Sequence, residues 1–313
     1  MNKSLKVAFF GTSDRSIPIL EALHKNYSLN LIITKTDSLF GRKKTLKETQ
    51  VKTWAKENRV NFVTINKADQ SWKNQVVEQL ISSNVELGIV ADFSFIIPKT
   101  IINTLKFGII NIHFSALPKY RGASPIQFSI LNGDKESAIT YYLMDEGMDT
   151  GKIIKVVPFM INSDATTQDL YNETFLLASK NLAEVISGYI RQELIPYEQP
   201  SEGISYTYSK SRPKSTLIYK DDARITKEMS ARETYNAIRA FNPWPIAFLK
   251  IQDFAEFEAF NLKKYQLKHP KYKDLTVKIF EATLENNFVT PETVQVEGSN
   301  KISFKDFING YFI

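Results

Sequence analysis

Three polar residues alternate along one short apolar stretch and could do chemistry together. Asn111, His113 and Ser115 stand at i, i+2 and i+4 in the segment NIHFS. On a β-strand this spacing places all three side chains on one face, while Ile112 and Phe114 face the opposite way. An amide N–H and a protonated imidazole can both donate to an oxyanion that forms at a carbonyl. The spacing alone also fits a structural histidine, so further groups must decide between the two interpretations.

Two loops supply such groups. LPKYRGASP, with Pro118, holds Tyr120 and Arg121 near the end of this predicted strand, and MDEGMDTG at 144–151 includes Asp149. An aspartate beside the histidine would orient the imidazole and help to relay the proton that an attacking amine loses. The chain has no cysteine. This set therefore favours direct group transfer over a covalent enzyme intermediate.

Ser115 as a nucleophile activated by His113 is the competing interpretation. Two residues apart on one strand face, the Cβ atoms are about 7 Å apart, which is unfavourable for a hydrogen bond between the side chains. The sequence therefore places Ser115 with the following loop rather than with the attacking group.

The surrounding sequence must position these residues, and it alternates short apolar runs with helical patterns. KVAFFG precedes SIPILEALHK, and the alternation continues through GIINIHF to the long helical pattern that ends near residue 190. Strands separated by helices indicate an α/β domain with a doubly wound, Rossmann-like parallel sheet, here residues 1–190. Ligands bind such sheets at the carboxyl ends of the strands. Residues 111–115 and 145–151 both lie at predicted strand ends.

The periodicity stops after residue 190. Residues 191–207 gather Pro, Gly and Ser and predict a linker. Residues 208–313 contain the helical pattern SARETYNAIRAF and strand patterns such as TVKIFEATL, which indicate a smaller C-terminal β-barrel domain. The single Gly11 in FFGTSD lacks the spacing of a dinucleotide-binding loop, so we expect a capped strand-to-helix turn there.

Composition limits the possible functions. The 313 residues are 43% hydrophobic and carry a formal charge of +6, with much of the basic excess in the C-terminal third. A mild basic excess permits a polyanionic partner without requiring one. Three scattered histidines and no cysteine argue against a metal site. No apolar run approaches the length of a membrane span, and no secretion signal is evident, so we expect a cytoplasmic protein.

Longer motifs identify a family. NIHFSALPKYRGASPIQ followed by MDEGMDTGKII resembles the folate-dependent formyltransferases, whose pattern is N-x-H-x-S-L-L-P-x-Y/W-R-G-A-x-P and then M-D-x-G-x-D-T-G. The resemblance extends to FGTSDRSIPILEAL, to GRKK with VKTWA, to RAFNPWP and to VQVEGSNKISFKDFINGY, and so covers nearly the whole chain. The GRKK loop and the C-terminal ending favour the branch of the family that acts on tRNA. The resemblance implies an OB-like C-terminal domain that binds tRNA.

The resemblance also implies the reaction. The amino group of methionine on initiator tRNA would attack the formyl carbon of 10-formyltetrahydrofolate, giving a tetrahedral oxyanion. Asn111, His113 and Asp149 would be the catalytic residues: Asn111 and His113 would stabilise the oxyanion, and Asp149 would position His113 and assist proton transfer. We expect a monomer that needs no metal.

Binding residues follow from the same motifs. The resemblance implies folate contacts from residues of three loops: Phe95, Ile96, Ile97, Ser115, Leu117, Pro118 and Asp145. It implies tRNA contacts from basic residues: Arg42, Lys43, Lys44 and Arg239. Ordinary core packing for the apolar residues of 95–97, and a solvated charge cluster for GRKK, remain open alternatives.

The chain departs from the family pattern in three places. Residues 13–15 are Ser-Asp-Arg where Pro-x-Phe is frequent, and Asp92 and Ser94 stand where Ala or Tyr and Gly are common. The region between TVKIFEATL and VQVEG is short, which predicts a trimmed C-terminal domain. Two rival functions stay open: a formyltransferase acting on an amino-sugar nucleotide, and a non-catalytic basic RNA-binding protein.

Overall fold

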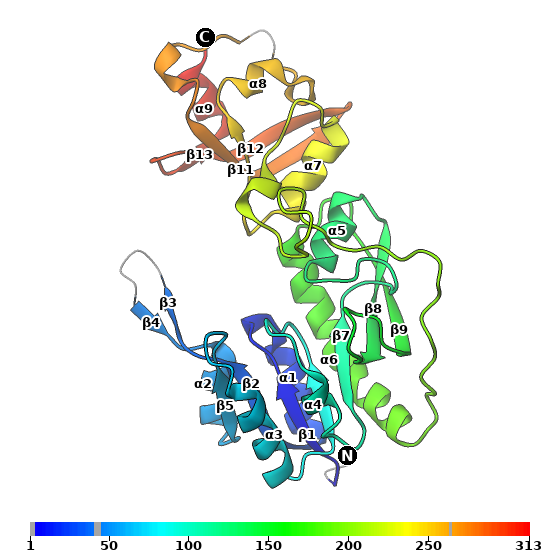
Figure 1. Cartoon of the computed structure of the whole chain (residues 1–313). Helices are drawn as coiled ribbons and strands as arrows, with labels where there is room; N and C mark the ends of the chain where they lie inside the picture. The colour runs from blue at the N-terminus through cyan, green and yellow to red at the C-terminus, as the bar shows by residue number, and fades with distance from the viewer. Residues whose placement is uncertain (1–3, 41–44, 263–264) are drawn as a thin grey trace. The chain divides into compact units, whose positions relative to one another are not determined.

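A computed structural model describes residues 4–40, 45–262 and 265–313 of the chain. Within these residues the chain forms two compact units (Figure 1). The first unit comprises the residues up to Arg121 together with Ala138–Phe159 and Tyr171–Ser205, and the second comprises Gly122–Ser137, Met160–Leu170 and Tyr206–Ile313. Two short stretches of the predicted N-terminal domain, residues 1–190, thus group with the C-terminal residues, and most of the predicted linker groups with the first unit.

A seven-stranded sheet organises the N-terminal half, in the order β5-β2-β1-β6-β7-β8-β9. Its strands are β1 (Lys6–Phe10), β2 (Ser28–Lys35), β5 (Phe62–Ile65), β6 (Leu87–Val90), β7 (Ile109–His113), β8 (Glu136–Leu143) and β9 (Ile153–Met160). The pairs from β5 to β7 are parallel, as the alternating pattern predicts, whereas β7 pairs with β8 in antiparallel register. The predicted α/β class is therefore confirmed, and the sheet is parallel only up to β7.

Helices connect the parallel strands. They are α1 (Ile17–Asn26), α2 (Gln50–Glu57), α3 (Trp72–Ser82) and α4 (Lys99–Ile102), with a 3-10 turn at Asp14–Ser16. The long α6 (Thr167–Ile190) follows the last strand, β9. Ser13 caps that turn through its side chain, as expected for the segment after Gly11. In α3 the residues at i, i+4 and i+8, Trp72, Val76 and Leu80, are buried, which is the periodicity of an amphipathic helix.

A short hairpin follows β2. β3 (Ser38–Phe40) pairs in antiparallel register with β4 (Thr45–Lys47), and in Figure 1 the hairpin extends away from the sheet. The expected tRNA contacts Arg42, Lys43 and Lys44 fall between these two strands, outside the described residues.

The second unit contains an antiparallel four-stranded sheet in the order β10-β11-β12-β13. The strands are β10 (Ala247–Lys250), β11 (Thr276–Glu285), β12 (Phe288–Val296) and β13 (Lys301–Ser303). The helices of this unit are α5 (Pro125–Leu131), α7 (Ala231–Ala240), α8 (Asp253–Glu256) and α9 (Phe304–Tyr311), with 3-10 turns at Lys220–Ala223, Glu258–Phe260 and Pro270–Tyr272. Asn286 and Asn287, both at positive φ (49° and 63°), join β11 to β12 in a tight hairpin.

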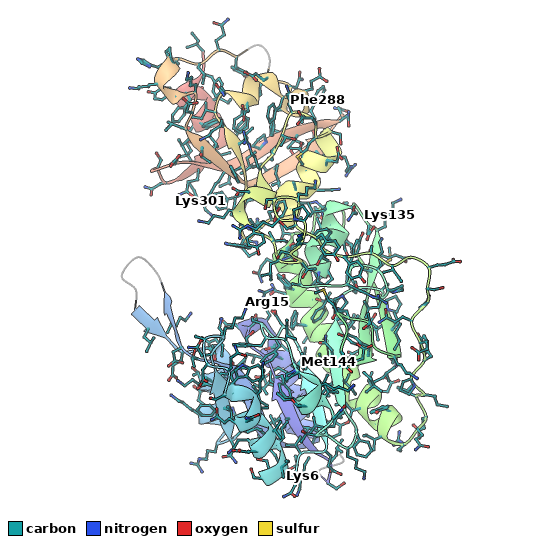
Figure 2. All side chains as sticks on the ribbon, viewed as in Figure 1. Lys6, Arg15, Lys135, Met144, Phe288 and Lys301 are labelled. Atoms are coloured by element: carbon teal, nitrogen blue, oxygen red, sulfur yellow. The ribbon has the colours of Figure 1, made fainter. Side chains whose placement is uncertain are left out.

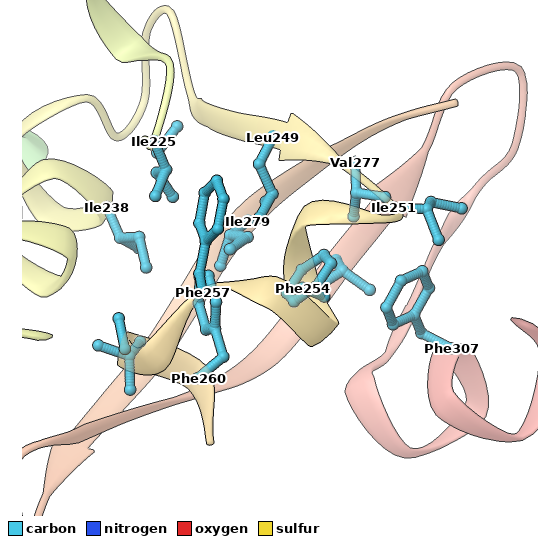
Figure 3. Close-up of a cluster of buried hydrophobic side chains, with 14 of the residues drawn as sticks. Ile225, Ile238, Leu249, Ile251, Phe254, Phe257, Phe260, Val277, Ile279 and Phe307 are labelled. Atoms are coloured by element: carbon cyan, nitrogen blue, oxygen red, sulfur yellow. The ribbon is translucent and has the colours of Figure 1, made fainter. Parts of the chain in front are cut away.

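Aromatic packing forms the core of the second unit. Phe254 is fully buried, and its ring contacts Phe260, Phe304 and Phe307 with centroids 4.9 to 5.8 Å apart. Figure 3 shows Phe254 and Phe307 beside Val277 and Ile251 in this cluster. The short sequence between β11 and β12 therefore closes a hairpin over a complete apolar core.

Candidate active site

Asn111 and His113 lie near the carboxyl end of β7, the strand at which the parallel part of the sheet ends. The His113 side chain is only 6% exposed. Its Nε2 lies 3.0 Å from the carbonyl oxygen of Tyr120. Because a carbonyl oxygen can only accept, this contact requires the proton on Nε2 and leaves Nδ1 as the edge available to other groups.

The loop after β7 is held by internal hydrogen bonds. The Ser115 hydroxyl donates to the carbonyl oxygen of Lys119 at 2.6 Å, and Thr140 Oγ1 donates to the carbonyl oxygen of Ser115 at 2.6 Å. Tyr120, at φ 60°, completes a tight turn. These bonds fix the position of the carbonyl that holds His113.

This packing changes the interpretation of three residues expected to touch folate. Ser115 is fully enclosed, Leu117 packs against Tyr142 and Ile153, and Pro118 is buried too. Met144, labelled in Figure 2, joins the same apolar group. The three side chains of the loop therefore shape the backbone around His113, and this arrangement gives none of them an exposed surface for a ligand.

The second loop presents Asp149. Asp145 Oδ1 accepts hydrogen bonds from Gly147 N at 3.0 Å and from Thr150 Oγ1 at 2.6 Å, which close the loop on itself. Asp149 adopts a left-handed backbone conformation with φ 53°, which Asp tolerates better than most residues. Asp145, expected as a folate contact, therefore uses one carboxylate oxygen to build the turn that carries Asp149.

The structure brings the three expected catalytic side chains together. His113 Nδ1 lies 3.7 Å from Asp149 Oδ2. Asn111 Nδ2 donates to the Tyr142 hydroxyl at 2.7 Å, and that hydroxyl donates to Asp149 Oδ1 at 2.7 Å. An amide, an imidazole and a carboxylate are thus connected over one face of the β7–β8 pair, and these are groups that direct transfer to a carbonyl carbon can use.

Gln199, from the predicted linker, also supports the site, and the sequence pattern did not reveal it. Its Nε2 donates to the carbonyl oxygens of Asp149 and Gly151 at 2.8 and 2.9 Å. Its Oε1 accepts from Arg121 Nη2 at 2.7 Å. One side chain therefore joins the loop after β7 to the loop that carries Asp149.

The apolar loop after β6 divides into two parts. Ile97 is 6% exposed and packs in the core, and the Phe95 ring lies against Trp72 and Phe93. Ile96 is 91% exposed. Of the three expected folate contacts in this loop, Ile96 alone presents most of its surface, while Ile97 has the environment of an ordinary core residue.

Two of the departures from the family pattern lie next to each other. Arg15, labelled in Figure 2, has its Nε atom 3.7 Å from Asp92 Oδ2, and its guanidinium carbon lies 3.8 Å from the ring centroid of Tyr171. Thr12 Oγ1 and Ser94 Oγ are 2.8 Å apart. Two polar contacts therefore link the loops after β1 and β6, which carry the unusual residues, at the carboxyl edge of the sheet.

Arg239 requires a correction. The residue is 7% exposed, and its guanidinium donates to the carbonyl oxygen of Ala165 at 2.7 Å and to Asn236 Oδ1 at 2.8 Å. These bonds lie inside the second unit. Arg239 is thus a buried structural cation, with no free guanidinium surface for an RNA phosphate.

In the part of the chain that the structure describes, no group of three or more histidine, aspartate or glutamate side chains could hold a metal ion. No helix among those residues has the length and apolar character needed to cross a membrane.

Two family profiles match the sequence of this chain. Residues 5–186 match the profile described as formyl transferase, and residues 217–311 match the one described as formyl transferase, C-terminal domain. The chain therefore belongs to the formyl transferase family, and it is an enzyme of one-carbon group transfer.

Within the formyl transferase family, this chain is similar over its full length to proteins named methionyl-tRNA formyltransferase. A methionyl-tRNA formyltransferase of Clostridium novyi is 28% identical over 98% of this chain and 97% of its own length. One from Legionella pneumophila is 30% identical over 97% of this chain and 95% of its own length. The resemblance to the tRNA-acting branch inferred from the motifs is thereby confirmed.

Solved structures support the fold. A methionyl-tRNA formyltransferase from Clostridium thermocellum covers 93% of this chain and 98% of its own, at 19% identity and a TM-score of 0.57. An N-formyltransferase from Helicobacter canadensis, solved with folinic acid and dTDP-3-aminofucose, covers 98% and 97% at 22% identity and a TM-score of 0.59. The two structures share a fold with this chain although their names imply different acceptors.

Proposed function

We propose that this chain transfers the formyl group of 10-formyltetrahydrofolate to the amino group of methionine carried by initiator tRNA. The observation that carries the proposal is the full-length similarity, at 28–30% identity, to proteins named methionyl-tRNA formyltransferase. The contacts among Asn111, His113 and Asp149 supply the groups that such a transfer needs. In this role the chain is a cytoplasmic enzyme of translation initiation.

The reaction proceeds by direct attack of the amine on the formyl carbon. The carbonyl π electrons move to oxygen and give a tetrahedral oxyanion. The second N–H of Asn111 and the Nδ1–H of a protonated His113, on the edge that Tyr120 does not bind, stabilise this oxyanion by hydrogen bonding. Asp149 accepts a proton from the attacking nitrogen, and His113 gives its proton to the departing N10 of tetrahydrofolate as the bond to carbon breaks; the proton on Asp149 then restores His113. Proton and charge thus balance without a covalent bond to the enzyme.

The formyl donor is a substrate in this scheme, and one exposed residue is suited to pack against the flat face of its pterin ring. Ile96, 91% exposed after β6, offers an uncovered apolar surface at the carboxyl edge of the sheet. Flat ligands gain free energy by covering such surface. We therefore assign Ile96 to the pterin side of the donor site and the side chains of Phe95 and Ile97 to its support.

A labelled-donor assay tests the proposal. The full chain is incubated with 10-formyltetrahydrofolate carrying ¹⁴C in the formyl group and with charged initiator tRNA, and label in the methionine ester is measured. Parallel reactions contain a dTDP-amino sugar or uncharged tRNA. Label in charged tRNA alone is the expected result. Transfer only to the amino sugar would instead support the sugar-acting alternative, and no transfer at all would support the RNA-binding one.

A further inference from the structure

Tyr142 lies at the centre of the site although neither the motifs nor the proposed chemistry assigned it a part. It is on β8, 2% exposed, and stands directly opposite Asn111 in the antiparallel register of β7 and β8. Residues opposite each other in such a pair project their side chains to the same face of the sheet. The phenol ring packs against Leu117 and Ile153, so its position is fixed before any ligand binds.

The two hydrogen bonds of the Tyr142 hydroxyl run in one direction. A carboxylate only accepts, so the single phenolic proton goes to Asp149 Oδ1, at 2.7 Å. The phenolic oxygen is then left to accept, and it accepts from Asn111 Nδ2 at 2.7 Å. Because the hydroxyl has only one proton, the order of donation is fixed: Asn111 donates to Tyr142, and Tyr142 donates to Asp149.

We propose that Tyr142 is a positioning residue, which sets the orientation of both the Asn111 amide and the Asp149 carboxylate for formyl transfer. This inference rests on the proposed function. It adds to the reaction a residue that touches neither substrate but acts through two residues that do.

The effect on Asn111 concerns its amide. A side-chain amide can turn by half a rotation and exchange its oxygen for its nitrogen. A hydroxyl already donating to a carboxylate can only accept, so it selects the rotamer with Nδ2 toward Tyr142. One N–H is used in this contact, and the other is held ready for the oxyanion.

The effect on Asp149 concerns its two oxygens. Tyr142 binds Oδ1, and Oδ2 then faces His113 Nδ1 at 3.7 Å. Gln199 holds the backbone carbonyl of the same residue at 2.8 Å. Asp149 is therefore held at its backbone carbonyl and at one carboxylate oxygen, and the oxygen that faces His113 is the one that Tyr142 does not bind.

The hydroxyl of Tyr142 stays protonated at physiological pH. Burial of the hydroxyl, together with the negative charge of Asp149, raises the pKa of Tyr142 well above its ordinary value of about 10. The hydroxyl thus remains a donor to Asp149 wherever the enzyme works, and it does not titrate as an acid or base of the reaction.

Tyr141 provides a matched control within the same strand. It is fully buried, and its hydroxyl donates to the carbonyl oxygen of Ala178 at 2.8 Å. As the neighbour of Tyr142 on a strand, it faces the opposite side of the sheet. Tyr141→Phe and Tyr142→Phe each remove one buried hydroxyl and keep the ring, so they differ only in which groups lose a partner.

The experiment compares kcat, both KM values and urea unfolding for the full chain and these two variants. We expect kcat of Tyr142→Phe to fall about tenfold to a hundredfold, because small losses of alignment have effects of that size. Its KM values should stay within about twofold, since the hydroxyl touches neither substrate. Tyr141→Phe should lose stability without a comparable fall in kcat.

Other results would overturn the assignment. A kcat of Tyr142→Phe equal to that of the unchanged enzyme would do so, and so would an equal fall in both variants, which would reduce Tyr142 to a structural bond. If the unchanged enzyme formylates no acceptor, it is the proposed function that fails. The ¹⁵N side-chain resonance of Asn111 then decides: broadening or splitting in Tyr142→Phe alone supports positioning, and identical spectra in both variants reject it.

Discussion

His113 Nδ1 faces Asp149 Oδ2 across 3.7 Å, and the two side chains are only 6% and 14% exposed. This separation exceeds that of an ordinary hydrogen bond, about 3 Å. The pair is close enough for the carboxylate charge to act on the imidazole in a site largely shielded from water. The contact that fixes the ring is made on its other side, by the carbonyl oxygen of Tyr120.

His113→Ala and Asp149→Asn should each lower kcat by about two orders of magnitude or more, because each removes a group that handles charge or a proton in the transition state. Asn tolerates the left-handed backbone at position 149 as Asp does, so the second variant changes charge without straining the loop. Single-turnover kinetics with saturating donor measures the effect. Unchanged rates in both variants would refute the assigned roles, provided their urea unfolding curves match that of the parent.

Ser115→Ala should retain most of the turnover, since the hydroxyl is bonded to the Lys119 carbonyl and not to His113. Loss of one buried hydrogen bond should lower stability by about 1 kcal/mol. Steady-state kinetics and chemical denaturation separate the two effects. If a fully folded Ser115→Ala protein transferred no formyl group, the alternative interpretation of Ser115 as the nucleophile would be supported.

Gln199→Leu keeps the approximate size of the side chain but removes its bonds to Asp149, Gly151 and Arg121. We expect kcat to fall about tenfold as the Asp149 loop loses its support. Glu202→Gln, an exposed change in the same segment, is the control and should leave kcat unaltered. Equal kcat values for the two variants would show that residues 191–207 act only as a linker and that Gln199 does not support catalysis.

Lys43→Ala with Lys44→Ala should weaken tRNA binding and reduce the slope of log affinity against log salt by about one for each phosphate that the two lysines neutralise. Filter binding between low and moderate salt gives the slope. Lys25→Ala with Lys106→Ala removes the same charge from exposed positions elsewhere and serves as the control. If the two double variants share one slope, the GRKK cluster is merely solvated.

Phe254→Ala should destabilise the second unit by about 3 to 5 kcal/mol, because the ring is fully buried among three other phenylalanines. Phe288→Ala removes the same atoms from a side chain that is 39% exposed and should cost much less. Urea denaturation followed by tryptophan fluorescence measures both. Similar midpoints for the two variants would contradict the packing described for this core.

Much of the fold was predictable because burial in this chain follows secondary-structure periodicity. The apolar runs that became β1, β2 and β6 are bounded by helical patterns, so their existence and parallel direction follow from local sequence, whereas their order in the sheet does not. The direction of β8 could not be predicted from local sequence, because a strand buried on both faces has the same residue pattern in parallel and antiparallel sheets. The position of Tyr142 opposite Asn111 depends on that direction and therefore stayed hidden.

Two further residues were misjudged for identifiable reasons. Gln199 sits in a segment without periodicity, where composition predicts a linker and gives no sign of its bonds to Asp149 and Gly151. Arg239 carries a charge in an amphipathic helix, which usually means exposure, but the Ala165 carbonyl and Asn236 bind its two Nη atoms inside the unit. In both cases a decisive partner is distant along the chain: Asp149 is 50 residues from Gln199, and Ala165 is 74 residues from Arg239.

The antiparallel pairing of β7 with β8 also makes activity a reporter of correct folding. A slip of one residue would bring Tyr141 or Leu143 opposite Asn111 and turn the Tyr142 hydroxyl to the other face of the sheet. A misregistered molecule would then lack the connection to Asp149 and transfer formyl groups much more slowly than a correctly folded one. In a refolded preparation, titration of active sites would therefore count the molecules whose strands have found their native register.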